Sequence, residues 1–168
     1  MSPQEPWRAL MAAENQYLDA LWDVREAGLE PQLRASLQDQ MGNRMLMRLL
    51  LHEPPEQTMP FVAHLFPVAT TINGRVARAR EVIGRVNSGW LFIALRPLIA
   101  ERLDAPEADY DDYRRIAEAL EQWDQHKHLA DLVARAETSN DPDIFEVAED
   151  FRRTYLPPED LHHGTPSG

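Results

Sequence analysis

Apolar side chains recur along nearly the whole chain at the spacing of an α-helix rather than that of a β-strand. The first helix is expected to run from Pro6, which suits a first helical turn, to Gly28. One of its faces is apolar: Trp7, Leu10, Tyr17, Leu18 and Leu21. The pattern as a whole predicts an all-α protein of about eight or nine helices.

Three shorter helices are expected next. Glu30 and Pro31 open a helix whose apolar residues Leu33, Leu37 and Met41 fall every fourth position, and Gly42 is expected to end it. Asn43 is a candidate cap for a helix over Met45–Leu51, which Pro54 and Pro55 close. A further helix should cover Thr58–Thr71, with Pro60 in its first turn and a kink at Pro67.

Asn73-Gly74 has two interpretations. It either separates two helices or forms the type I′ turn of a β-hairpin. The residues that follow favour the helix, because Val76, Ala79, Ile83 and Val86 form a helical stripe. An i, i+4 ion pair is expected between Glu81 and Arg85.

The most apolar segment begins at Ser88-Gly89 and includes Trp90–Leu95. A helix that is apolar on almost every side is expected at the centre of the core, bent by Pro97. An aromatic cofactor pocket is the alternative, but core packing explains the pattern fully.

Tyr110–Trp123, His126–Glu137 and Pro142–Tyr155 form three further predicted helices. Asp141 is placed to cap the last of them, with Pro142 as its first residue. Residues 156–168 are expected to form a disordered tail.

The C-terminal half contains an expected helix over Leu129–Ala136, a turn at Asn140–Asp143 and a second expected helix over Ile144–Phe151. In this arrangement it resembles a HEAT-type helical repeat. It implies that Leu129, Leu132 and Val133 face Ile144, Val147, Ala148 and Phe151. A looser pair, Trp90–Leu103 with Tyr113–Leu120, precedes it. The resemblance covers about residues 88–153 and implies antiparallel helix pairs stacked as a short α-solenoid.

Composition narrows the class of protein. The 168 residues contain no cysteine, which excludes a disulfide framework and a thiolate zinc site. A single domain over residues 1–155 is expected. The chain has no apolar run long enough for a membrane span and no export signal at its N-terminus, so we expect a cytoplasmic protein. Only Lys127 among the 17 basic residues is a lysine, which hints at a high-GC bacterial genome.

Negative charge is concentrated in the second half. Residues 1–86 carry 9 basic and 10 acidic side chains, whereas residues 87–168 carry 8 basic and 18 acidic ones. Such a surface repels phosphate backbones and attracts basic proteins, so we expect a basic protein partner and no nucleic acid. The alternative is that the acidic helices serve solubility alone.

The densest polar cluster is the acidic segment, residues 104–113. It contains five carboxylates and two tyrosines, all candidates for contact with a basic partner: Asp104, Glu107, Asp109, Tyr110, Asp111, Asp112 and Tyr113. The alternative is that its acids stabilise the N-terminus of the following helix.

Motifs of catalysis are absent from the sequence, including phosphate-binding loops, nucleophile elbows and zinc helices. His126 and His128 are two residues apart, so they cannot ligate one metal from one helix. A metal site of His52 and His64 with Glu53 or Glu56 is a remote alternative. We therefore expect no catalytic residues, metal or cofactor.

The function expected from these features is non-enzymatic protein binding, most concretely by a bacterial immunity-type protein that neutralises a basic toxin. One alternative is a structural or regulatory helical protein that self-associates through exposed Trp and Phe residues, so the sequence leaves a homo-oligomer open. A weaker alternative is an all-α metal-dependent enzyme.

Overall fold

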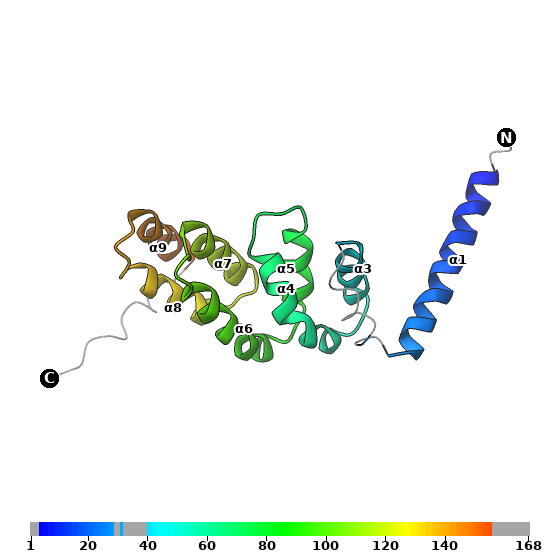
Figure 1. Ribbon diagram of the computed structural model, residues 1–168, viewed down its shortest axis with the longest axis horizontal. Coiled ribbons are helices and arrows are strands. Elements are labelled where there is room, and N and C mark those ends of the chain that lie inside the picture. Colours follow the sequence, from blue (N-terminus) through cyan, green and yellow to red (C-terminus); the bar gives the residue numbers. More distant parts are fainter. Residues whose placement is uncertain (1–3, 29–30, 32–39, 156–168) are drawn as a thin grey trace. The chain divides into compact units, whose positions relative to one another are not determined.

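The computed structural model describes residues 4–28, 31 and 40–155 (Figure 1). These residues form eight α-helices and one 3-10 helix, η1, with no strand among them, so the predicted all-α class is confirmed for this part of the chain. The helices belong to two compact units, Met1–Leu49 and Leu50–Gly168, which are described in turn. None of the helices in the described ranges is long and apolar enough to cross a membrane.

The first unit contains α1 (Gln4–Glu26) and most of α3 (Gln40–Leu50). The helix α1 begins two residues before the expected Pro6 and ends at Glu26, two residues before Gly28. The φ of Gly28, 87°, lies in the left-handed region that glycine adopts without steric cost. Between the two helices, the guanidinium of Arg48 lies 5.3 Å from the centre of the Tyr17 ring, a cation–π contact.

The expected boundary at Gly42 and Asn43 is wrong, because both residues lie inside α3. A glycine costs a helix interior only about 1 kcal/mol, which the rest of the helix can offset. The helix expected after Glu30 falls largely on residues 29–30 and 32–39, outside the described residues.

The second unit begins with η1 (Pro55–Phe61) and α4 (Val62–Ala69), where one helix over Thr58–Thr71 was expected. Pro60 lies in the 3-10 segment and Pro67 lies inside α4. Proline has no N–H to donate, which favours such division of a helical run into shorter pieces.

Asn73-Gly74 separates two helices, as expected, and α5 (Val76–Gly84) follows it. The Asn73 side chain orders the turn, since its Oδ1 accepts from the Arg75 amide at 2.8 Å and its Nδ2 donates to the Val68 carbonyl at 3.1 Å. No hairpin forms in this described segment.

The expected Glu81–Arg85 ion pair is wrong. Glu81 lies 3.6 Å from Arg78 on the same helix. Arg85 donates instead to the carbonyl oxygens of Leu50 at 2.6 Å and Glu53 at 3.0 Å. Arg85 therefore ties the end of α5 to the start of the second unit, a long-range contact that helical spacing cannot reveal.

The expectation that the apolar helix α6 (Ser88–Leu103) lies at the centre of the core is also wrong. Only Leu91, Leu95 and Leu103 of this helix are buried. Ile93 is 71% exposed and Trp90 is 55% exposed. Asn87 caps the helix, accepting from the amides of Gly89 and Trp90. The helix thus covers the core with one side and presents an apolar surface with the other.

The last three helices confirm the prediction closely: α7 (Tyr110–Gln122), α8 (His126–Ala136) and α9 (Pro142–Tyr155). Asp141 accepts the amide of Asp143 at 2.9 Å, as expected of a cap. Between α7 and α8, Asp124 adopts a left-handed conformation with φ of 54°. The expected tail, residues 156–168, lies outside the described residues.

The core of the second unit is built around α7, which packs against α5, α6, α8 and α9. The helix α4 packs against η1, α5 and α6, and α8 packs against α9 (Figure 1). All residues expected to lie between α8 and α9 are buried: Leu129, Leu132, Val133, Ile144, Val147, Ala148 and Phe151. This pairing by itself does not identify a HEAT repeat.

Candidate functional site

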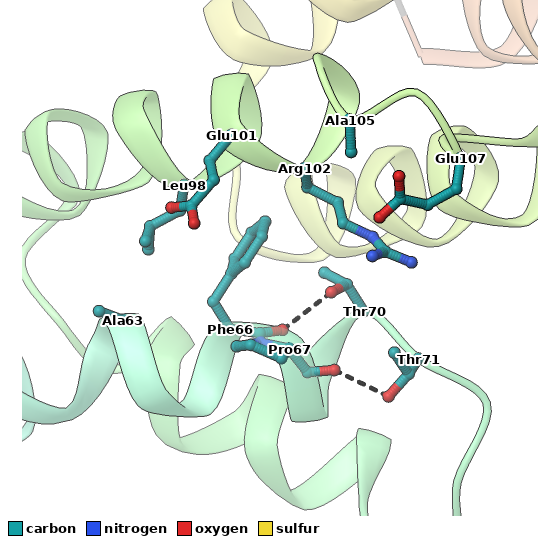
Figure 2. A pocket seen from close by; sticks show the side chains of 10 residues that line it. All are labelled: Ala63, Phe66, Pro67, Thr70, Thr71, Leu98, Glu101, Arg102, Ala105 and Glu107. Atoms are coloured by element: carbon teal, nitrogen blue, oxygen red, sulfur yellow. Dashed lines mark hydrogen bonds between the residues drawn. The ribbon is translucent and has the colours of Figure 1, made fainter.

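A groove of about 450 Å³ lies between α4 and the C-terminal part of α6 (Figure 2). Its α4 side is formed by residues along that helix and by the two threonines that follow it, and its α6 side by the end of α6 and the loop after it. The lining residues are Ala63, Phe66, Pro67, Thr70, Thr71, Leu98, Glu101, Arg102, Ala105 and Glu107. The volume lies in the range of small-ligand or side-chain pockets.

The α4 wall is fixed by local hydrogen bonds. The Thr70 hydroxyl donates to the Phe66 carbonyl at 2.9 Å, and the Thr71 hydroxyl donates to the Pro67 carbonyl at 2.8 Å (Figure 2). Pro67 has no N–H, so the carbonyl oxygen of Ala63 receives no hydrogen bond from the residue four positions further on. The α4 side of the groove therefore combines the buried ring of Phe66 with the carbonyl oxygen of Ala63, which can accept a hydrogen bond.

The α6 side of the groove carries one positive side chain, Arg102, and two negative ones, Glu101 and Glu107. The guanidinium of Arg102 contacts the buried carboxylate of Asp112, with Nη2 and Nε at 2.6 and 2.8 Å from Oδ1. This pair compensates the positive charge of Arg102. Glu101 and Glu107 are exposed, and neither forms an ion pair within the part of the chain that the structure describes. Among the described residues, the groove thus has two carboxylates that form no ion pair, and they lie beside the apolar side chains of Phe66 and Leu98.

Within the acidic segment, Asp109 and Asp112 stabilise the start of α7. The Asp109 carboxylate accepts the Asp112 amide at 3.2 Å, and the Asp112 carboxylate accepts the Asp109 amide at 3.4 Å. This reciprocal arrangement is a capping box. Asp112 is only 6% exposed, so it offers little surface to a partner.

Arg135 of α8 engages Asp104 and Tyr113. Its guanidinium donates to the Asp104 carboxylate at 2.6 Å, to the Tyr113 hydroxyl at 2.8 Å and to the Leu103 carbonyl. The hydrogen bond with Asp104 is the main cause that raises the pKa of Arg135 above its ordinary value. Tyr113 is buried. Arg135 therefore joins the end of α6 to α7 and α8.

Replacing Arg135 by lysine is expected to destabilise the protein by about 1 kcal/mol, because an ammonium group cannot reach three acceptors in the fork geometry of a guanidinium. Urea unfolding followed by circular dichroism measures the change. Arg78→Lys is the control, since Arg78 makes only an exposed pair with Glu81 and the change should stay within about 0.5 kcal/mol. Equal effects of the two substitutions would contradict the role given to Arg135.

The other members of the acidic segment are more accessible. Glu107, Asp109 and Asp111 are exposed, and Tyr110 is half-buried with the Arg114 guanidinium 5.8 Å from its ring centre. The structure therefore brings five members into internal contacts: Asp104, Asp109, Tyr110, Asp112 and Tyr113. Of the seven residues chosen from the sequence, Glu107 alone lines the groove.

Sequence reasoning missed the groove residues of α4 and α6. Glu101 was not chosen, although it follows Leu98 by three residues and so lies on the same side of the helix. This three-residue spacing is the one signal in the sequence that could have identified Glu101. Phe66 lies in α4 and Thr70 directly follows it, about thirty residues earlier in the chain, and their approach to α6 is a property of the fold.

The four histidines of the described residues, His52, His64, His126 and His128, do not assemble a metal site. No group of three or more His, Asp or Glu side chains in the described ranges is placed to hold a metal ion. His52 is exposed, and burial lowers the pKa of the half-buried His64. His126 is exposed while His128 is buried, stacked on Phe92 with its Nε2 2.8 Å from the Phe92 carbonyl oxygen.

No protein-family model matches this chain, and no curated protein or solved structure shows significant similarity to it.

Proposed function

We propose that the protein is a non-enzymatic binding module that holds a basic protein at the groove between α4 and α6. Its most concrete form is an immunity-type protein that neutralises a basic toxin. The observation that carries the proposal is the pair of uncompensated carboxylates, Glu101 and Glu107, in a groove floored by Phe66 and Leu98.

The chemistry of this groove suits an arginine or lysine side chain. The aliphatic stem of such a side chain covers apolar surface while its charged end meets carboxylates. Asp112 holds the guanidinium of Arg102, so the one cation in the lining is already paired. The excess of negative charge over residues 87–168 would speed the approach of a basic partner.

The arrangement of the second unit supports a stacked helical architecture for this module. Contacts run between α4 and α6, between α5 and α7, and between α7 and α9, each linking helices two places apart in the chain. Successive helix pairs in a solenoid make this type of contact. We therefore propose that the binding module is a HEAT-like stack of helix pairs.

Neutralising Glu101 and Glu107 together, as Glu101→Gln/Glu107→Gln, is expected to weaken capture of the basic partner by about tenfold, chiefly through slower association. Immobilised protein is incubated with lysate of the source cells at low and high salt, the retained proteins are identified, and their association rates are measured. A basic protein released by salt is the expected ligand.

The matched control is Glu146→Gln/Glu149→Gln, which removes the same charge from exposed positions on α9. This variant should retain the partner with at most a small change in association rate. Equal losses in both variants would show that only net charge matters and would overturn the groove as the site. Retention unaffected by the groove substitutions would overturn it as well.

A further inference from the structure

The helix α1 carries an apolar stripe that is exposed to solvent. Its exposed fractions reach 63% for Trp7, 64% for Trp22, 49% for Met11 and 46% for Leu18. Soluble proteins rarely leave a contiguous surface of large apolar side chains uncovered, and such stripes mark interaction sites. The opposite face bears Glu5, Asp19, Asp23 and Glu26. These acids disfavour an anionic membrane surface as the ligand.

Three residues of the stripe, Trp7, Met11 and Leu18, lie on a line with the spacing of a coiled-coil seam, which also includes the half-buried Leu21. Positions 7, 11, 14, 18, 21 and 25 succeed one another at intervals of four and three residues, the pattern of a and d sites in heptads. Four of these sites hold apolar side chains: Trp7, Met11, Leu18 and Leu21. The other two hold Glu14 and Arg25, side chains of opposite charge.

The two charged seam positions favour one occupant and one direction for residues 14–25 of α1. In an antiparallel pair with Leu18 opposite Leu21 of a second copy, Glu14 lies opposite Arg25 of that copy. The two-fold axis repeats each contact, which gives two leucine layers flanked by two ion pairs. A parallel pair would instead place Glu14 against Glu14 and Arg25 against Arg25.

We propose that α1 binds α1 of a second copy of this chain in the antiparallel register that places Glu14 opposite Arg25. The chain is then a homodimer joined through its first unit. The guanidinium of Arg25 has five N–H donors, so an ion pair with the second copy is compatible with contacts in its own chain. This dimer is independent of the groove and of the partner proposed for it.

The first test is the mass of the full-length protein by sedimentation equilibrium over the micromolar range. A dimer is expected, and Leu18→Asp should convert it to a monomer by placing carboxylates in the central layers. Ile72→Asp is the matched control, because Ile72 is 72% exposed and lies outside α1; this variant should stay dimeric. A wild-type monomer, with the stripe covered by its own chain, would overturn the proposal.

The second test is an exchange of the seam charges, which keeps good helix-forming residues in α1. Glu14→Arg and Arg25→Glu alone should each raise the dissociation constant at least about tenfold, because like charges then face each other. The double exchange should restore the dimer, and an equimolar mixture of the two single variants should form a heterodimer. Single variants as tight as the wild type would overturn the antiparallel register.

Discussion

Replacing Ile116 by alanine is expected to lower the free energy of unfolding by about 2–5 kcal/mol. Ile116 is fully buried on α7, the helix in contact with α5, α6, α8 and α9. The substitution removes three carbon atoms from a place where several helices would have to move to fill the cavity. Urea unfolding of the wild type and the variant, followed by circular dichroism, gives the difference.

Ile93→Ala is the control for this prediction, because it makes the same chemical change on α6 at a side chain that is 71% exposed. Its expected effect lies within about 0.5 kcal/mol. The comparison tests where the core lies. A large loss at Ile93 with a small one at Ile116 would restore α6 as the centre and contradict the burial described above.

Replacing Asp112 by alanine is expected to destabilise the protein by about 2–3 kcal/mol. The substitution removes one half of the capping box with Asp109 and leaves the Arg102 guanidinium without its carboxylate. The adjacent Asp111 is exposed, so Asp111→Ala should change stability by no more than about 0.5 kcal/mol. Thermal unfolding of both variants under identical conditions provides the comparison.

The same two variants separate the roles of neighbouring carboxylates. Asp112 stabilises the start of α7 and pairs with Arg102, while Asp111 is exposed to solvent. If Asp111→Ala proves as destabilising as Asp112→Ala, the contacts of Asp112 are not what stabilises the start of α7. Loss of partner binding in Asp112→Ala at a temperature where it remains folded would indicate an indirect route, through release of Arg102 in the groove lining.

Local signals predicted the last three helices well. The starts at Tyr110, His126 and Pro142 agree with the structure, and the ends agree within one residue. The caps that decide these starts, such as Asp141, lie within a few residues of the bonds they accept. Short-range chemistry of this kind can be read from a single sequence.

Burial could not be predicted in the same way for α6. The hydropathy of Trp90 and Ile93 measures how unfavourable their contact with water is, and it does not say how many helices surround them. The helix packs against α4 and α7, which cover part of its surface. An apolar run is therefore compatible with a helix buried on one side only.

The candidate site was missed in part for a related reason. The acidic segment shows which carboxylates are close in sequence, but the arginines that engage them come from elsewhere in the chain. Arg102 precedes Asp112 by 10 residues and Arg135 follows Asp104 by 31. The fold thus decides which carboxylates are occupied, and it leaves Glu101 and Glu107 for the groove.

The position of α7 also determines how the second unit opens. A helix that contacts four others loses its covering only when most of the unit separates, so its backbone amides should exchange with solvent deuterons by global unfolding. The amides of Ile116, Ala117 and Leu120 are then the slowest to exchange. The amides on the solvent-facing side of α6 do not require global unfolding to exchange. We expect them to exchange faster, through local fluctuations of the helix.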